Sequence, residues 1–415
     1  MFEMDESSWY HSIAIIRSGK YSKQNFMIKR LLFLQMLLIV LACNAQLQEQ
    51  GVHIPIFVKH NITAQYISEG AAAGDVNNDG KTDVIAGAFW FEAPSWKRHE
   101  ISGNDTFDIK TYGNSFLNFA MDVNQDGWID YIRVDHPGQP VVWFENPQNS
   151  PGHWKMHQIN ASLGNESPMM VDIDGDGRLD IIGNDAVEKQ VIWLKSPVKK
   201  GDITWQKIIV SADENLATHR YTHGIGFGDI NGDGRKDIVI KQGWFEAPVN
   251  RMQPNWIFHS SDISEDCSEM YVLDLNGDGL NDIISASAHN YGIWWHEQKR
   301  DNEGKITWVH HEIYKKFSQT HGLLVTDINE DGNPDIITGK RFFAHNGKDP
   351  GAFEPAVLYW FEFRPGNNPS WVPHEIDNNS GVGLHVVVQD VNGDGLPDIL
   401  TGNKKGVHLF LQQKK

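Results

Sequence analysis

Cysteine is almost absent from this chain, since Cys43 and Cys267 are the only two among 415 residues. Two cysteines cannot build the disulfide framework on which many small exported domains depend. The sequence also lacks a Gly-x-Ser-x-Gly elbow, a phosphate-binding loop and a dinucleotide fingerprint. These absences argue against serine-hydrolase chemistry and against chemistry that depends on nucleotides or nicotinamide cofactors.

Long hydrophobic runs are lacking as well. Lys29 and Arg30 precede twelve mostly apolar residues, Leu31 to Ala42, and this run is too short to span a bilayer as a helix. A basic start followed by a short apolar run is typical of an export signal. The chain is therefore predicted to leave the cytoplasm.

The residues after this run indicate where the exported protein goes. Val40-Leu41-Ala42-Cys43 resembles a bacterial lipobox, which makes Cys43 the predicted lipid anchor and the only expected link to a membrane. Cleavage after Ala45 is the alternative. The expected product is an outer-membrane lipoprotein or a periplasmic or secreted protein. Residues 1–45 are assigned to an N-terminal extension and signal, with Met1 or Met27 as the start.

Positive charge is scarce: 36 Lys and Arg face 54 Asp and Glu, for a formal net charge of −18. Nucleic acid is therefore not an expected partner. Much of the acidic excess is concentrated in short stretches such as "DINGDGRKD", residues 229–237. Positions 1, 3 and 5 of this stretch can turn three oxygens towards one point, and Gly234 permits the bend. Such a set suits calcium.

An EF-hand begins in the same way, but it requires a bidentate Glu at position 12 and flanking helices. Position 12 of this stretch is Ile240, and the following "IVIKQGWFEAP" indicates a strand and a turn. The stretch instead recurs seven times, at spacings of 45 to 63 residues, which is the mark of a propeller or solenoid. The predicted calcium ligands at positions 1, 3, 5 and 9 are Asp75, Asn77, Asp79, Asp83, Asp122, Asn124, Asp126, Asp130, Asp172, Asp174, Asp176, Asp180, Asp229, Asn231, Asp233, Asp237, Asp274, Asn276, Asp278, Asp282, Asp327, Asn329, Asp331, Asp335, Asp390, Asn392, Asp394 and Asp398.

With these loops, residues 52 to 411 resemble the FG-GAP/VCBS repeat β-propellers, whose blades each carry an Asp-x-Asx-x-Asp-Gly-x-x-Asp calcium loop. The resemblance implies an all-β, seven-bladed β-propeller that binds up to seven structural calcium ions. A second repeat, an aromatic residue followed by His three positions later, occurs after the loops, as in "WKRHEI" (96–101). Its extra copy "FVKHNI" (57–62) precedes the first loop, so this strand is expected to complete the last blade. The predicted domain is a single propeller over 52–413.

Residues that break the repeat are the candidates for function, because a residue present in every blade serves the blade. They fall before the inner strands, between blades and in the turns between second and third strands, three places that share the face opposite the calcium loops in this family. The catalytic candidates are His223, His321, Tyr221 and His385, and the substrate-binding candidates are Lys241, Lys340, Arg341, His345, Glu166 and Glu269.

A weaker resemblance links the propeller and its inner-strand histidines to aldos-2-ulose dehydratases and to propeller polysaccharide lyases. It implies β-elimination on uronate-containing, sulfated or keto-sugar oligosaccharides. Such a reaction needs a base, an acid and a group that stabilises the enolate. His223 or His321 is the expected base, and Tyr221 or the other histidine is the expected acid. His385 stands one position out of step, so strand alternation should turn it the other way.

Three further hypotheses stay open at this stage. The protein could bind a glycan or a protein without turnover, using Phe342 and Phe343 as a platform. It could hydrolyse glycosides through Glu166 and Glu269. An additional divalent metal ion could be held in the central funnel by the histidines with one of these glutamates. In each case the expected partner is an anionic oligosaccharide or polysaccharide, and the expected state is a monomer.

Overall fold

The computed structural model describes residues 54–414, and Pro55 onwards forms one compact unit. Within this described part there is no α-helix, only strands and one 3-10 turn, η1 (Ala344–Gly347). None of the described residues forms a helix that could cross a membrane. The predicted signal and Cys43 lie outside the described residues.

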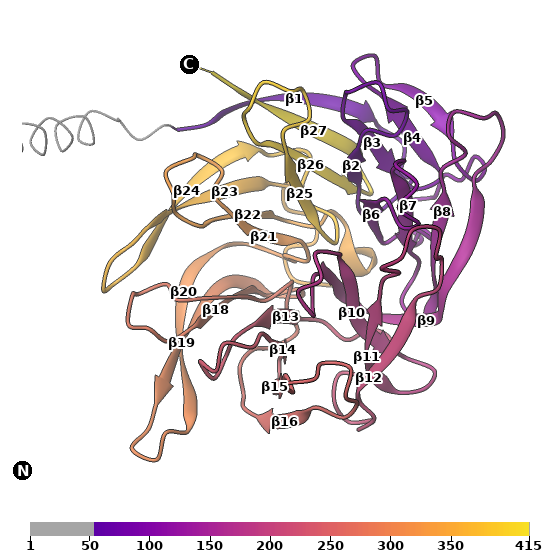
Figure 1. Ribbon diagram of the computed structural model, residues 1–415. Helices are drawn as coiled ribbons and strands as arrows, with labels where there is room; N and C mark the ends of the chain where they lie inside the picture. The colour runs from indigo at the N-terminus through magenta and orange to yellow at the C-terminus, as the bar shows by residue number, and fades with distance from the viewer. Residues whose placement is uncertain (1–53, 415) are drawn as a thin grey trace, which may run out of the picture. The chain divides into compact units, whose positions relative to one another are not determined.

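The strands form small antiparallel sheets (Figure 1). Five sheets have four strands each, and in spatial order their members are β2 (Ala72–Gly74), β3 (Asp83–Ala86), β4 (Phe89–Glu92) and β5 (Lys97–Glu100); β13 (Ile225–Gly228), β14 (Asp237–Ile240), β15 (Gly243–Glu246) and β16 (Ile257–Ser260); β17 (Tyr271–Leu273), β18 (Asp282–Ala286), β19 (Tyr291–Arg300) and β20 (Ile306–Ser318); β21 (Leu323–Thr326), β22 (Asp335–Gly339), β23 (Leu358–Arg364) and β24 (Ser370–Asp377); and β25 (Val386–Gln389), β26 (Asp398–Asn403), β27 (Gly406–Gln413) and β1 (Ile56–Thr63).

The sixth sheet has seven strands because one strand serves two groups. In order, its strands are β6 (Leu117–Met121), β7 (Asp130–Val134), β8 (Gln139–Glu145), β9 (Lys155–Val171), β10 (Asp180–Asp185), β11 (Gln190–Lys195) and β12 (Gln206–Ser211). The first half of β9 pairs with β8 as far as Leu163, and the second half pairs with β10 from Gly164 onwards. The described chain thus contains seven groups of four strands.

The two ends of the described chain meet in one sheet. β1 runs antiparallel to β27, with Ile56 opposite Gln413 and His60 opposite Leu409. Strands that begin neighbouring groups also contact one another, as β25 does β2 and β21, and as β13 does β9 and β17. In Figure 1 the groups surround a common centre, with these first strands on the inside.

Each predicted calcium loop is clamped by the aspartate at position 9. In one loop, Asp237 accepts hydrogen bonds from the backbone N–H of Ile230 at the loop's start and of Ala247 after the third strand, both at 2.9 Å. Gly234 in this loop has φ +84°, which explains the glycine at position 6. Buried carboxylates need such partners. The position-9 aspartates are all fully buried and each begins a strand: Asp83, Asp130, Asp180, Asp237, Asp282, Asp335 and Asp398.

The recurring histidines lie in the outer strands and belong to the scaffold. The ring of His259 stacks on Trp244 with centroids 4.1 Å apart, and its Nε2 lies 2.8 Å from a carboxylate oxygen of Glu246. The same arrangement recurs in four more groups, with the pairs Trp90 and His99, Trp143 and His157, Trp295 and His311, and Trp360 and His374.

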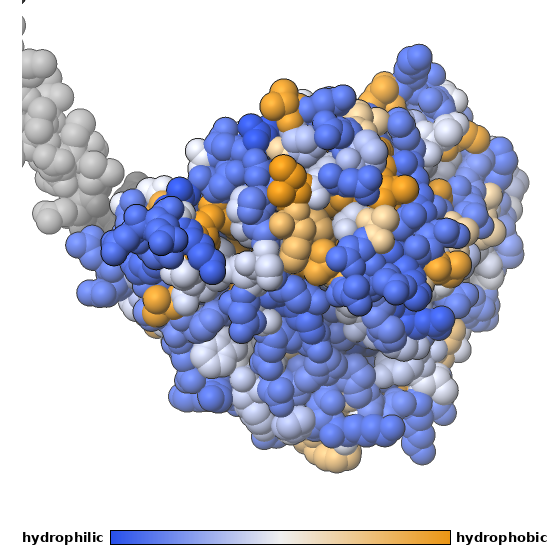
Figure 2. Space-filling model, turned by 90° about the horizontal axis from the view of Figure 1, so that it is seen from below, coloured by the Kyte–Doolittle hydropathy of each residue, from blue (hydrophilic) through white to orange (hydrophobic). Residues whose placement is uncertain are grey.

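Apolar side chains fill the spaces between neighbouring groups. Trp193 and Phe245, from consecutive groups, share one buried cluster, and Trp360 and Phe410 share another. The face shown in Figure 2 is mainly hydrophilic, with hydrophobic residues in small patches. The apolar surface is therefore used mainly to pack the groups against one another.

Candidate functional site

Arg341 lies at the centre of the candidate site. It follows β22 in a long turn, and its side chain is fully buried. Its Nε donates to Glu69 at 3.1 Å and its Nη1 donates to Glu166 at 3.2 Å. Glu69 and Glu166 come from distant parts of the chain, so one guanidinium joins three strand groups. Arg341 was predicted to bind substrate, but its charge is already matched by two carboxylates.

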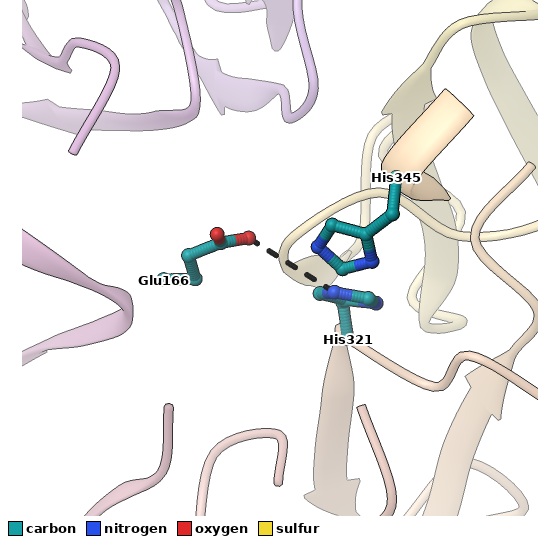
Figure 3. A group of neighbouring side chains, drawn as sticks. All are labelled: Glu166, His321 and His345. Atoms are coloured by element: carbon teal, nitrogen blue, oxygen red, sulfur yellow. Dashed lines mark ion pairs between the residues drawn. The ribbon is translucent and has the colours of Figure 1, made fainter. Parts of the chain in front are cut away.

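Four imidazoles gather beside this ion pair. The histidine cluster consists of His223, His289, His321 and His345, with Glu166, Asp266 and Asp349 around them. Neighbouring rings have centroid distances of 4.7 to 5.5 Å around the cluster. Figure 3 shows Glu166 approaching from one side while His321 and His345 approach from the other.

Backbone and carboxylate groups hold the Nδ1 atom of each ring. His223 Nδ1 lies 3.0 Å from the carbonyl oxygen of Tyr221, and His321 Nδ1 lies 3.3 Å from that of Gln319. A carbonyl can only accept, so these Nδ1 atoms carry hydrogens. In a neutral ring the Nε2 atom then keeps its lone pair. Both Nε2 atoms point at one oxygen of Glu166, at 3.7 and 3.9 Å.

Burial varies across the cluster. His223 and His321 are 4% and 1% exposed, whereas His289 and His345 are half-buried. Burial lowers the pKa of His223 and lowers that of His321 well below its ordinary value. Burial opposes ionisation of Glu166, yet the charges of His223 and Arg341 hold its pKa below the ordinary value. The cluster thus combines a carboxylate with two deeply buried imidazoles, whose charged forms burial disfavours, and its more exposed side is formed by His289 and His345.

Two lysines that were predicted to bind substrate, Lys340 and Lys241, already contact neighbouring polar groups. Lys340 is fully buried, and its Nζ donates to Ser318, Gln319 and the carbonyl of Gly351, so it supports the long turn. Lys241 Nζ lies 2.5 Å from Asp266 at the edge of the cluster. The partners of Lys340 thus come from its own turn, at Gly351, and from the end of β20 in the preceding group, at Ser318 and Gln319.

His385 and Glu269 lie apart from the cluster. Both line an apolar cavity of about 470 Å³ among the first strands. His385 stacks on Phe119 and its Nε2 lies 2.8 Å from the carbonyl oxygen of Ala71. Glu269 accepts the backbone N–H of Leu323 at 3.0 Å, and burial raises its pKa to about 8. The position of His385, one residue out of step, explains why it faces elsewhere.

An arc of aromatic side chains completes the exposed side; we call it the aromatic wall. His136 lies between Tyr112 and Tyr221, with ring centroids 5.7 and 5.6 Å away. Phe116 joins the wall to the cluster, because its ring centroid lies 6.0 Å from that of Tyr112 and 5.1 Å from that of His136, and Arg341 lies 5.9 Å above it. Lys404 Nζ lies 4.7 Å above the Tyr112 ring. Tyr221 is 44% exposed, so it lines the wall and not the buried cluster.

Sequence reasoning missed several of these residues although it named the right places. His289, His136 and Lys404 lie in turns between second and third strands, the same class of turn that holds Lys241 and Arg341. Tyr112 lies in the connection between the first two groups. Their departure from the repeat was the available signal. Asp349 carried none, because a single acidic residue in a long turn is unremarkable.

The predicted calcium loops fit a hard cation by their donor chemistry. In the loop 172–180, carboxylate oxygens of Asp172, Asp174 and Asp180 lie within 4.8 Å of one another. One oxygen each of Asp174 and Asp180 is buried without a hydrogen-bond partner. In this loop Lys195 pairs with the aspartates at positions 3 and 5, Asp174 and Asp176. Lys195 stands two residues after Trp193, where five of the other groups carry glutamate.

Comparisons with known proteins identify the repeats. An FG-GAP-like repeat profile matches residues 122–183 and 274–338. A T-cell immunomodulatory protein homolog from Plasmodium falciparum (isolate 3D7) is 22% identical over 277 residues, covering 55% of this chain and 38% of that protein. The chain therefore spans less than half the length of this relative.

Solved structures with a similar course of the chain share little sequence with it. Rhamnogalacturonan lyase YesW has a TM-score of 0.42 at 10% identity, with 86% of this chain and 74% of that chain covered. The V. cholerae biofilm matrix protein Bap1 has a TM-score of 0.31 at 15% identity, with 81% and 44% covered. The chain therefore contains FG-GAP-like repeats in the two regions that the profile matches, and the Asp-rich loop typical of them occurs seven times in the sequence.

Proposed function

We propose that residues 52–413 form one closed seven-bladed β-propeller, in which each four-strand group is a blade and β1 completes the last. The pairing of β1 with β27 and the contacts between neighbouring first strands support this closure. Closure leaves no unpaired edge at the junction of the two ends. The proposed unit is a monomer.

Each Asp-rich loop is proposed to bind one calcium ion, giving up to seven. The donors are carboxylate and amide oxygens at positions 1, 3, 5 and 9, which calcium prefers. In the loops, the backbone already satisfies part of each carboxylate, as at Asp229, which accepts the N–H groups of Gly232 and Gly234. The remaining lone pairs are available to an ion.

The function that the site supports best is β-elimination on an anionic sugar by an exported protein. The observation that carries this proposal is the histidine cluster with its Glu166–Arg341 pair, flanked by an aromatic wall. Stacking aromatic groups suit a sugar ring, and the exposed Arg220 beside the wall suits its acidic end. A uronate or keto-sugar oligosaccharide meets both requirements.

The wall residues are assigned the proton transfers. His223 and His321 were the expected bases, but at 4% and 1% exposure they are too buried to meet a sugar carbon directly. His136 is half-buried, and burial lowers its pKa, so it is neutral and can accept the proton α to the carboxylate. The electron pair then forms the carbon–carbon double bond as the leaving oxygen departs. Tyr112, whose pKa is raised by burial, donates a proton to that oxygen.

Anion binding falls to Arg220, which is exposed and lies 5.9 Å over the Tyr221 ring, because Lys404 is only 3% exposed. The second candidate function is glycan binding without turnover, and one observation favours it: Lys405 lies 4.5 Å above the ring of Phe342, and both side chains are partly exposed, as in a binding platform. Hydrolysis gains no support, because Glu166 is paired with Arg341 while Glu269 lines the apolar cavity.

Incubation of the purified, calcium-saturated protein with uronate oligosaccharides tests the proposal. The expected result is a rise in ultraviolet absorbance from the unsaturated product, with a new non-reducing end in mass spectrometry. Binding of the same oligosaccharides without any product would favour the glycan-binding function. If the protein neither bound these oligosaccharides nor formed product, both candidate functions would be wrong.

Lipid attachment at Cys43 during export is tested separately, by labelling cells with a fatty-acid analogue.

A further inference from the structure

We propose that the histidine cluster binds one divalent transition-metal ion through Nε2 of His321, a ring nitrogen of His345 and a carboxylate oxygen of Glu166. Atoms of Glu166, His321 and His345 that can ligate an ion lie within 4.8 Å of one another. The inference stands on this geometry and does not depend on the sugar chemistry. It gives the buried His321 a role as a ligand.

The spacing of the atoms separates a metal site from hydrogen bonds. His223 and His321 approach Glu166 Oε2 at 3.7 and 3.9 Å. A charge-assisted N–H···O hydrogen bond is about 2.7–2.9 Å long, so no proton bridges either gap. Metal–ligand bonds of about 2.0–2.1 Å in a tetrahedral site put ligand atoms roughly 3.3 Å apart. The observed separations need to contract by only a few tenths of an ångström.

Unpartnered lone pairs supply the second observation. The Nε2 atoms of His223 and His321 are buried and have no hydrogen-bond partner among the described residues. Each faces a carboxylate oxygen, so in a neutral ring the buried lone pair opposes a negative charge. Such a group is costly unless a cation lies between. A metal ion bound between His321 and Glu166 would satisfy both of their facing atoms.

The surrounding residues hold the ligands as an outer shell does in metal sites. Asp349 Oδ2 lies 2.6 Å from Nδ1 of His345 and 3.4 Å from Nδ1 of His289, which turns the Nε2 atoms of both rings towards the cluster. Backbone carbonyls do the same for His223 and His321. Arg341 fixes Glu166. A carboxylate or carbonyl behind each histidine is the arrangement that orients metal ligands.

The ligand set also indicates the kind of ion. Several imidazoles with one carboxylate suit zinc, manganese, iron or cobalt, whereas calcium prefers oxygen alone. His289 lies on the half-buried side with Asp266, where its ring centroid is 4.7 Å from that of His223. That side leaves room for a further ligand from solvent or substrate.

The scaffold histidines show the contrast. His99 Nε2 lies 2.8 Å from Glu92, within hydrogen-bond distance, and its ring stacks on Trp90. That nitrogen already has a partner, so His99 provides a matched control for the cluster histidines.

The test is a zinc titration of the full chain in excess calcium, after removal of bound metals, followed by elemental analysis and by cobalt(II) absorption. The expected result is one zinc per chain, displaced by one cobalt whose visible bands report nitrogen ligands. His321→Ala and His345→Ala should each weaken zinc binding by more than the about 10–100-fold typical of outer-shell changes, while His99→Ala leaves it unchanged.

His345 lies in a partly exposed turn, so its variant keeps the test sound if His321→Ala fails to fold. Zinc binding that is unaffected by His345→Ala, or that is absent from the folded wild-type protein, would overturn the metal site. Sugar elimination that proceeds equally in the metal-free protein would support the proposed function and show that it does not need the metal. Zinc binding with no sugar turnover would support the metal site and contradict the proposed function.

Discussion

Arg341 and Glu166 are 175 residues apart in the chain, yet Nη1 of the arginine lies 3.2 Å from a carboxylate oxygen of the glutamate in the buried centre of the molecule. The same guanidinium contacts Glu69. The centre is therefore filled by an ion-paired network, and the histidine cluster rests on it. Stability and the geometry of the site depend on the same side chain.

Arg341→Ala should destabilise the protein strongly. The change leaves two buried carboxylates without their cation, which typically costs about 3–5 kcal/mol in the free energy of unfolding. Denaturant unfolding in saturating calcium measures the loss. Lys189→Ala, which removes an exposed lysine from the exposed Glu214, is the control and should cost at most about 1 kcal/mol. Equal losses in the free energy of unfolding would show that the central ion pair contributes no more to stability than a surface pair.

Chelation should lower the melting temperature strongly. The loops concentrate carboxylates, and an ion that binds only the folded state adds stability that its removal takes away. Differential scanning calorimetry with calcium, and again with chelator, measures the difference. A melting curve that chelator leaves unchanged would mean that calcium does not stabilise the blades.

Lys195→Ala should strengthen calcium binding at the loop 172–180, because the ammonium of Lys195 competes with calcium for Asp174 and Asp176.

Deleting residues 55–64 removes β1 and exposes the edge of β27. An unpaired edge strand favours aggregation, so the truncated protein should aggregate or fail to fold. Size-exclusion chromatography of the refolded protein reports the outcome. Lys59→Ala breaks only the 2.9 Å pair with Asp377 and should cost at most about 1 kcal/mol. A soluble truncated protein with an unchanged melting temperature would show that β1 does not close a ring.

Glu269 should make stability depend on pH. Burial raises its folded pKa to about 8, against an ordinary value of 4.5. The folded state therefore keeps a proton that the unfolded state has lost, and the free energy of unfolding falls as pH rises between these values. Glu269→Gln should flatten that part of the curve, whereas Glu303→Gln, an exposed control, should not. Parallel wild-type and Glu269→Gln curves would mean that Glu269 is ionised in the fold.

The strands and the Asp-rich loops could be predicted from the sequence because each group needs the same residues at the same positions. Every position-9 aspartate must clamp a loop to a strand end, and every glycine at position 6 must bend, so the pattern is visible seven times. The extra copy of the outer-strand motif likewise predicted the pairing of β1 with β27. Repetition made these features readable.

The site could be predicted only in part, because its residues occur once each. Breaks in the repeat drew attention to five residues that the structure brings together: His223, His321, His345, Glu166 and Arg341. They could not show which way a side chain turns. Lys340 and Arg341 are neighbours, yet one supports a turn and the other crosses to two glutamates on distant strands. Such pairings depend on the closure of the whole chain.

The aromatic wall gives the last prediction. If His136 accepts the sugar's proton and Tyr112 protonates the leaving oxygen, His136→Ala and Tyr112→Phe should each lower kcat by about 10²- to 10⁴-fold, the usual scale of acid–base assistance. Tyr112→Phe keeps the aromatic ring of the wall, so KM should change little. Arg220→Ala should instead raise KM for an anionic substrate more than for its methyl ester, because it removes the positive charge beside the wall that would pair with the carboxylate.

Steady-state kinetics on one uronate oligosaccharide, with each variant's folding checked by its calcium-bound melting temperature, measures these effects. His99→Ala is the matched control, because that scaffold histidine stacks on Trp90 and should alter stability without altering turnover per folded molecule. Full activity in both His136→Ala and Tyr112→Phe would show that residues outside the aromatic wall transfer the protons. If Tyr112→Phe abolished glycan binding as well as turnover, Tyr112 would be a binding residue and not the acid that protonates the leaving oxygen.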